Sequence, residues 1–203
     1  MPIADTSAYL SDLTGVMQTH WPANRTVNIV CHGHSVPAGY FATPFVNTLN
    51  AYPHLLHATL KHRFPYAVMN VIVTAIGGEN SVSGAARFEA EVLNHRPDVV
   101  MIDYGLNDRG LGLEKAGAAW RGMIAAARKR GARVILMTPT ADLTLAPGYA
   151  GADQGRMAEH AAQIRALAAE YGTGLVDSSD FLIPIRNRSC FSEKGLALFP
   201  THR

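Results

Sequence analysis

The chain has 203 residues and a formal net charge of +2, from 18 basic and 16 acidic residues. This length is ordinary for one α/β domain and is enough to bury a substantial core. The charges are nearly balanced and form no block of like sign, so binding to nucleic acid or to an anionic membrane surface is not indicated. We therefore expect a single domain over residues 1–203.

The N-terminal region predicts a helix from about Thr6 to Thr19. It contains acidic residues, and it has neither the basic start nor the apolar core that signal peptides and membrane spans have. We therefore expect a cytoplasmic protein. Cys31 and Cys190 lie far apart in the sequence, which favours free thiols in a reducing compartment.

Apolar runs bounded by turn-forming residues predict five strands. They cover residues 27–31, 67–73, 98–103, 133–137 and 174–177.

Amphipathic segments between these strands predict helices at residues 44–63, 83–95, 113–130 and 154–171. In the first of these helices, Thr43 is the expected cap and Pro44 lies in the first turn. Pro53 is expected to kink or split its interior, because proline removes a hydrogen bond there.

The alternation of strands and helices predicts right-handed crossovers, a parallel sheet and helices on both faces. The expected fold class is α/β, a three-layer α/β/α domain with a doubly wound, parallel, five-stranded sheet of the flavodoxin-like type. Ligands of such sheets bind at the carboxyl ends of the strands. Ser35, Gly78 and Asn107 follow the first, second and third predicted strands, so we expect them to converge there.

These residues have the chemistry of an acyl-transfer site. Ser35 follows a strand end, where a hydroxyl can stand clear of regular structure and act as a nucleophile. The negative charge that develops on a carbonyl oxygen needs preorganised N–H donors. The backbone at Gly78 and the carboxamide of Asn107 are suitable donors.

The same three segments resemble the sequence blocks of the SGNH (GDSL-like) hydrolase family, which carry Ser, Gly, Asn and His in that order. Gly33-His34-Ser35 is similar to the first block, with His34 in place of the usual Asp. The segment from Ile76 to Ser81 is similar to the second block, and Gly105-Leu106-Asn107-Asp108 matches the third. The resemblance covers roughly residues 27–177. It implies the SGNH hydrolase fold, with Ser35 as the nucleophile and Gly78 and Asn107 at the oxyanion hole.

The family's last block, Asp-x-x-His followed by Pro, has its nearest match at residues 199–203. The resemblance implies His202 as the general base, although Phe199 stands at the position of the Asp. Asp177 and Asp180 are the alternatives for orienting the imidazole. The segment 181–203 is atypical because it lacks clear periodicity. If a final helix is missing, it leaves apolar sheet surface that a second copy of the chain is a candidate to cover.

The remaining histidines predict no metal site. His54 and His57 have helical spacing, but no carboxylate or cysteine completes a ligand set. His34 is next to Ser35, but adjacent side chains of an extended segment point apart. His34 is therefore expected to order the loop and not to contact Ser35, and His32 is expected to do likewise. We expect no cofactor.

The function expected from these residues and this resemblance is a serine esterase that forms an acyl-enzyme. Its substrate is expected to be a small ester, either with a short acyl chain or an acetylated carbohydrate. Two alternatives stay open. One is a catalytically impaired relative that binds a glycan or acyl ligand, and the other is a thioesterase or acyltransferase that uses the same site.

Overall fold

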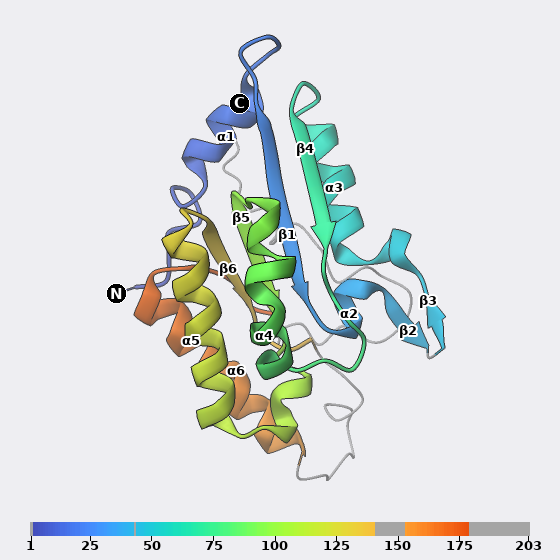
Figure 1. Ribbon diagram of the computed structural model, residues 1–203, viewed down its shortest axis with the longest axis vertical. Coiled ribbons are helices and arrows are strands. Elements are labelled where there is room, and N and C mark those ends of the chain that lie inside the picture. The colour runs from blue at the N-terminus through green and yellow to red at the C-terminus, as the bar shows by residue number, and fades with distance from the viewer. Residues whose placement is uncertain (1, 43, 141–152, 179–203) are drawn as a thin grey trace.

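The computed structural model describes every residue except 1, 43, 141–152 and 179–203 (Figure 1). Its centre is a five-stranded sheet in which all neighbouring strands are parallel. Across the sheet the order is β4 (Val68–Val73), β1 (Thr26–Gly33), β5 (Val99–Asp103), β6 (Arg133–Met137) and β7 (Gly174–Val176). Counted along the chain, this is the order 2-1-3-4-5 of flavodoxin-like sheets. The predicted fold class is confirmed.

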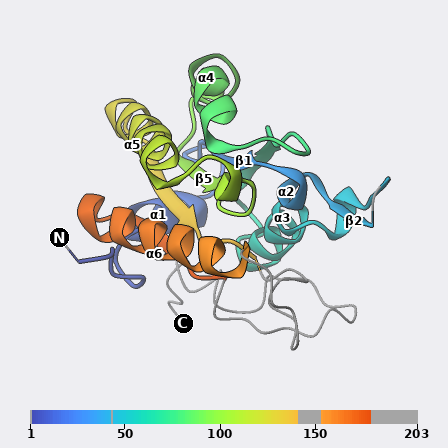
Figure 2. The same cartoon turned by 90° about the horizontal axis from the view of Figure 1, so that it is seen from below.

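Helices cover both faces of the sheet. The longer ones are α1 (Ser11–Gln18), α3 (Tyr52–Arg63), α4 (Ser81–Glu91), α5 (Leu113–Lys129) and α6 (Asp153–Tyr171). Shorter segments are α2 (Ser35–Ala38), η1 (Thr48–Asn50), η2 (Leu93–His95) and η3 (Asn107–Gly110). A small hairpin, β2 (Tyr40–Ala42) and β3 (Phe45–Val46), projects from the body beside α2 (Figure 2). Within the described ranges, no helix has the length and apolar character needed to cross a bilayer.

Two apolar clusters fill the space between the sheet and its helices. Residues of α1 and α3 pack on one face, against Ile29 and Cys31 of β1. Residues of α4, α5 and α6 pack on the other face, against Val30 of the same strand. Because side chains alternate along a strand, β1 contributes to both clusters. This explains why the central strands are continuous apolar runs in the sequence.

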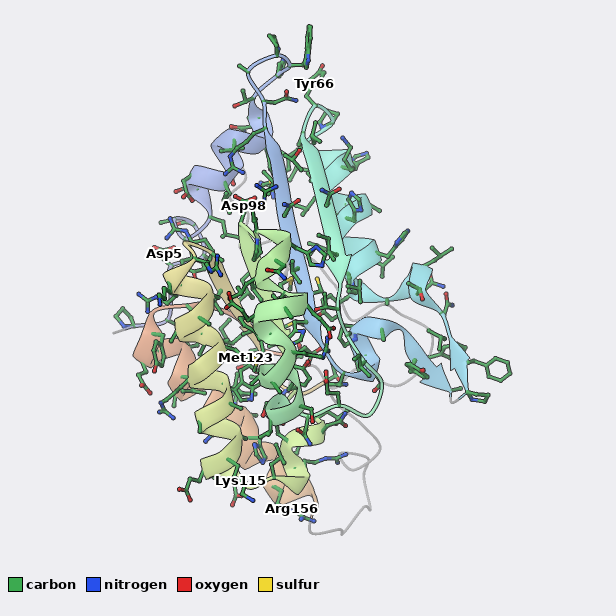
Figure 3. The ribbon with its side chains drawn as sticks, viewed as in Figure 1. Asp5, Tyr66, Asp98, Lys115, Met123 and Arg156 are labelled. Carbon is green, nitrogen blue, oxygen red and sulfur yellow. The ribbon has the colours of Figure 1, made fainter. Side chains whose placement is uncertain are left out.

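The two ends of the sheet carry different structures. Tyr66 and Asp98 lie at the end where the strands begin, whereas Lys115 and Arg156 lie toward the opposite end (Figure 3). Asp98 accepts the N–H of Asn28 at 2.8 Å and pairs with Arg25 at 2.8 Å. These contacts fix β5 beside β1 at the starting end. The carboxyl ends remain available for the loops that follow β1, β4 and β5.

The predicted helix at 44–63 was too long. The helix begins at Tyr52, and η1 and β3 occupy part of the preceding segment. Pro53 lies in the first turn of α3, where no backbone N–H is required, so it begins the helix and does not kink it. The expected cap, Thr43, lies outside the described residues.

Three smaller differences concern helix starts and short elements. The N-terminal helix begins at Ser11, later than expected. Helix α4 begins at Ser81, earlier than expected, because the side chain of Asn80 caps it by accepting the N–H of Ser83. Neither α2 nor the β2–β3 hairpin was predicted, since both are too short to show a periodic pattern.

A buried indole links the helical layer to the loop after β5. Trp120 of α5 is fully buried, and its Nε1–H donates to Asp108 Oδ2 at 2.7 Å. Asp108 Oδ1 accepts the N–H of Ser81 at 2.8 Å. Burial raises the pKa of the Asp108 carboxyl despite these hydrogen bonds. The three residues therefore fix η3, the start of α4 and α5 relative to one another.

We predict that Trp120→Phe lowers the free energy of unfolding by about 2–4 kcal/mol, since it removes a buried donor to Asp108 and leaves a void. Urea unfolding followed by circular dichroism measures the change. The matched control is Trp21→Phe, because Trp21 is 83% exposed. That variant is expected to stay within about 0.5 kcal/mol of the parent. Equal effects of the two substitutions would contradict the structural role of Trp120.

Candidate active site

Ser35 lies at the first position of α2, directly after β1. The chain can turn here because residue 33 is glycine. A Cβ at Gly33 would lie 2.5 Å from the carbonyl oxygen of Asp103 and 2.8 Å from Cγ of Pro37. The N–H of His34 also donates to the Asp103 carbonyl, at 3.2 Å. The half-buried Ser35 is thus held against the end of β5.

The loop at residues 74–80 runs beside the end of β1. The N–H of Thr74 donates to the carbonyl of Cys31, and the N–H of Ile76 donates to the carbonyl of Gly33, both at 3.0 Å. Gly78 is exposed and has φ +79°, a conformation that favours glycine. Among the described residues, no hydrogen bond uses its N–H. That N–H is therefore available to a ligand.

Asn107 begins η3, in the loop after β5. Its side-chain Nδ2 donates to the carbonyl of Glu79 at 2.8 Å. The contact joins the loop after β5 to the loop that contains Gly78. A carboxamide has two N–H bonds on this nitrogen, so one remains for a second acceptor. Ser35, Gly78 and Asn107 follow the adjacent strands β1, β4 and β5, so the structure places them at the carboxyl ends of these strands.

Glu79 fixes the loop beside Gly78 through a cluster of polar side chains. Its carboxylate accepts hydrogen bonds from Arg87 Nε and from the Tyr104 hydroxyl, each at 2.8 Å. Burial opposes ionisation of Glu79, but these donors outweigh it and lower the pKa of the carboxyl. Tyr104 reaches this position because residue 84 is glycine, where a Cβ would lie 2.3 Å from the Tyr104 oxygen.

His32 completes this cluster beneath the loop. Its Nδ1 lies 2.8 Å from Thr74 Oγ1, and its Nε2 lies 3.0 Å from the Tyr104 oxygen and 3.1 Å from the Gly84 carbonyl. Burial, together with the nearby charge of Arg87, lowers the pKa of His32 to about 4. His32 is therefore a neutral, loop-ordering residue near neutral pH.

The sequence alone did not predict that Glu79, Arg87 and Tyr104 belong to the site. Their separation in sequence hid the cluster, although the glycine at position 84 of a helix was a signal of close approach.

The side chain of His34 does not lie where the sequence predicts. The prediction that His34 and Ser35 point apart is wrong, because the chain leaves its extended conformation here and turns into α2. His34 Nδ1 accepts the N–H of Val36 at 3.3 Å and lies 3.3 Å from Ser35 Oγ. Its Nε2 lies 3.4 Å from Asp103 Oδ1. His34 therefore caps α2, contacts the serine and faces a carboxylate.

The residues predicted to serve as base and orienting acid fall largely outside the described part of the chain. His202 and Asp180 lie there, as do Cys190 and the whole segment 181–203. Asp177 is described and follows β7. It accepts hydrogen bonds from Thr138 Oγ1 at 2.9 Å and from Arg165 Nε at 2.6 Å. Since β5 and β6 separate β7 from β1, Asp177 lies about 14 Å from β1, three inter-strand spacings.

Within the described part of the chain, neither Cys31 nor the histidines of α3 lie in a group of potential metal ligands. Cys31 is buried with a free thiol, and burial raises its pKa. Within the described residues, no group of three His, Cys, Asp or Glu side chains is placed to hold a metal ion.

Comparisons with known proteins give one matching family. The model of the GDSL-like lipase/acylhydrolase family matches residues 31–192. A search of curated proteins finds no match.

Several solved structures share the fold. The acetylxylan esterase Axe2 from Geobacillus stearothermophilus has 21% identity and a TM-score of 0.63, with 75% of this chain and 76% of that chain covered. The acetyl xylan esterase AlAXEase has 24% identity and a TM-score of 0.64, covering 75% and 77%. A putative lipolytic protein of the G-D-S-L family from Desulfitobacterium hafniense has 22% identity and a TM-score of 0.61, covering 74% and 77%. At these identities, the likeness concerns the fold.

We predict that His32 makes the protein less stable in mild acid. Its pKa is about 4 in the folded state, whereas it is about 6.5 in the unfolded state, so the unfolded state binds more protons between these values. Between pH 6.5 and pH 5 this group lowers the free energy of unfolding by about 1.5 kcal/mol.

Urea unfolding at both pH values gives the change in the free energy of unfolding between pH 6.5 and pH 5 for the parent and for His32→Gln. The difference between these two changes measures the contribution of His32. The variant is expected to lose less stability on acidification. The control is His62→Gln, because His62 is an exposed histidine of α3. Its free energy of unfolding should change with pH as much as that of the parent. An equal change in the free energy of unfolding for the parent and for His32→Gln would contradict the prediction.

Proposed function

The chain belongs to the GDSL-like lipase/acylhydrolase family, and we propose that it is a serine esterase that acts on short-chain acyl esters or acetylated carbohydrate through an acyl-enzyme. Family membership makes it an SGNH-type ester hydrolase. The observation that carries the finer proposal is the meeting of three loops at the carboxyl ends of β1, β4 and β5. The contacts between Gly33 and Ile76, and between Asn107 and Glu79, support it.

In the proposed reaction, Ser35 Oγ attacks the ester carbonyl. The negative charge then moves to the carbonyl oxygen, and the N–H groups of Ser35 and Gly78 and the amide of Asn107 stabilise it. Such donors are effective because they are held in place before the charge appears. The hydrogen bond from Asn107 to Glu79, with the Arg87 and Tyr104 contacts behind it, supports this preorganisation. His202 as the base stays a prediction from the resemblance.

The substrate class is supported by two features. Axe2 and AlAXEase, which share the fold, are named as acetylxylan esterases. The hairpin after α2 also presents aromatic rings beside the site, with Phe41 70% and Phe45 66% exposed. Their apolar faces are suited to contact with a sugar ring, and a small acetyl group needs no long acyl channel.

We predict that Ser35→Ala abolishes hydrolysis of p-nitrophenyl acetate and of an acetylated xylose, with at least a ~1000-fold loss of kcat. The reason is that no other group replaces a nucleophile in an acyl-enzyme route. Steady-state kinetics at pH 8 measures the loss. The control is Ser11→Ala, since Ser11 is exposed on α1. Turnover by Ser35→Ala at the parent's rate would refute the esterase proposal.

We predict that Asn107→Ala lowers kcat by about a hundred- to a thousand-fold with little change in KM, because the lost donor acts on charge that develops in the transition state. Asn94→Ala is the matched control, as Asn94 is an exposed asparagine that bonds to the carbonyl of Ala90. A higher KM with unchanged kcat would instead place Asn107 in ground-state binding.

A further inference from the structure

We propose that Tyr40 is a positioning residue of the oxyanion hole and that its ring holds the peptide between Gly77 and Gly78. The inference rests on the proposed function, because that peptide carries the Gly78 N–H assigned to the oxyanion. The observation behind it is a contact between the β2–β3 hairpin and the loop after β4. A Cβ at Gly77 would lie 3.1 Å from Cε2 and 3.3 Å from Cζ of the Tyr40 ring. The ring therefore lies directly against the α-carbon of Gly77.

The peptide between Gly77 and Gly78 is the central peptide of a β-turn. The N–H of Glu79 donates to the carbonyl of Ile76 at 3.3 Å, which closes the turn around the two glycines. The φ angle is +79° at Gly78 and is not positive at Gly77, as in a type II turn. A half rotation of the central peptide converts a type II turn into type I and reverses the direction of its N–H. Glycine at both central positions makes either conformation accessible.

The hydrogen bonds of Ile76 and Glu79 described above hold the two ends of this turn and not its centre. Gly77 and Gly78 are both exposed. The three atoms nearest to the Cβ position of Gly77, apart from its chain neighbours, all belong to Tyr40. Among the described residues, nothing lies within 4 Å of the same position at Gly78. The ring of Tyr40 is thus the group placed to keep the central peptide in one orientation.

The backbone of the hairpin ties this ring to the nucleophile. Gly39, which has φ +101°, ends α2. Its N–H donates to the carbonyl of Ser35 at 3.0 Å, and its carbonyl accepts the N–H of Asn47 at 2.8 Å. A Cβ at Gly39 would lie 2.9 Å from the backbone of Thr48, so the two segments approach closely. Tyr40 follows Gly39 as the first residue of β2, and its position is therefore fixed relative to Ser35.

The ring of Tyr40 is placed differently from the other two rings of the hairpin. Tyr40 is 40% exposed, against 70% for Phe41 and 66% for Phe45. Phe41 and Phe45 contact each other, with ring centroids 6.4 Å apart. The Tyr40 atoms that meet Gly77 are ring carbons and not the hydroxyl oxygen. The contact therefore requires an aromatic ring at position 40, and phenylalanine meets this requirement.

The kinetic test compares the parent with Tyr40→Ala and Tyr40→Phe on p-nitrophenyl acetate, which carries no sugar for the hairpin to contact. Without the ring, only a fraction of the molecules presents the Gly78 N–H to the oxyanion. For Tyr40→Ala, kcat should therefore fall by about ten- to a hundred-fold while KM changes little. Tyr40→Phe should keep a kcat close to that of the parent. The control is Tyr66→Ala, because Tyr66 is an exposed tyrosine at the opposite end of the sheet (Figure 3).

A measurement by NMR tests the positioning independently of catalysis. In Tyr40→Ala, the ¹⁵N order parameter of the Gly78 amide should fall from the range of rigid backbone, about 0.85, toward that of flexible backbone, below about 0.6. Tyr40→Phe should keep the parent's value. The amide of Gly122 in α5 is the internal control and should be unchanged in both variants, which also shows that they are folded. A Gly78 amide as mobile in the parent as in Tyr40→Ala would overturn the proposal.

Two kinetic outcomes would also overturn it. The parent's kcat in Tyr40→Ala, with or without a raised KM, would show that the ring does not act on the oxyanion hole. An equal loss of kcat in Tyr40→Phe and Tyr40→Ala would assign the effect to the hydroxyl. Ser35→Ala tests the proposed function separately. Turnover by that variant at the parent's rate would remove the esterase function, whereas the order parameter of Gly78 would still show whether Tyr40 holds the turn.

Discussion

The close approach of β1 and β5 at Gly33 is the constraint on which the site depends. Residue 33 lies so near the Asp103 backbone that any side chain would collide with it, and the N–H of His34 donates to the same carbonyl. The chain leaves the sheet at this point and starts α2 with Ser35. One tight contact between neighbouring parallel strands therefore sets the serine, the histidine before it and a buried carboxylate in a single row.

The second half of the site depends on side chains, because its loops have little regular structure of their own. The loop containing Gly78 is exposed, yet Glu79 within it is held by Arg87 from α4 and by Tyr104 from the end of β5. His32, neutral because it is buried, fills the space beneath. Donors for an oxyanion must not move as charge develops. A polar network attached to α4 and to the ends of β1 and β5 gives the proposed donors that rigidity better than a glycine-rich loop alone.

The parts of this architecture that were predictable share a physical origin. The five strands were found because strands buried on both faces read as apolar runs, and the convergence of Ser35, Gly78 and Asn107 followed from parallel topology. The start of α3 was misplaced because Pro53 is compatible with either a kink or a first turn. The His34–Asp103 contact was not predictable, since it depends on the pairing of Gly33 with Asp103 in the register of β1 and β5. The Tyr104–Glu79 contact likewise needs the three-dimensional position of Gly84.

The residue at which the first block departs from its family pattern lies against Asp103. The block resembles Gly-Asp-Ser, but His34 stands where the aspartate is usual. His34 Nε2 lies 3.4 Å from Asp103 Oδ1, and His34 Nδ1 lies 3.3 Å from Ser35 Oγ. Residues 34 and 103 therefore share one buried contact, so a substitution at either position changes the surroundings of the other and of Ser35.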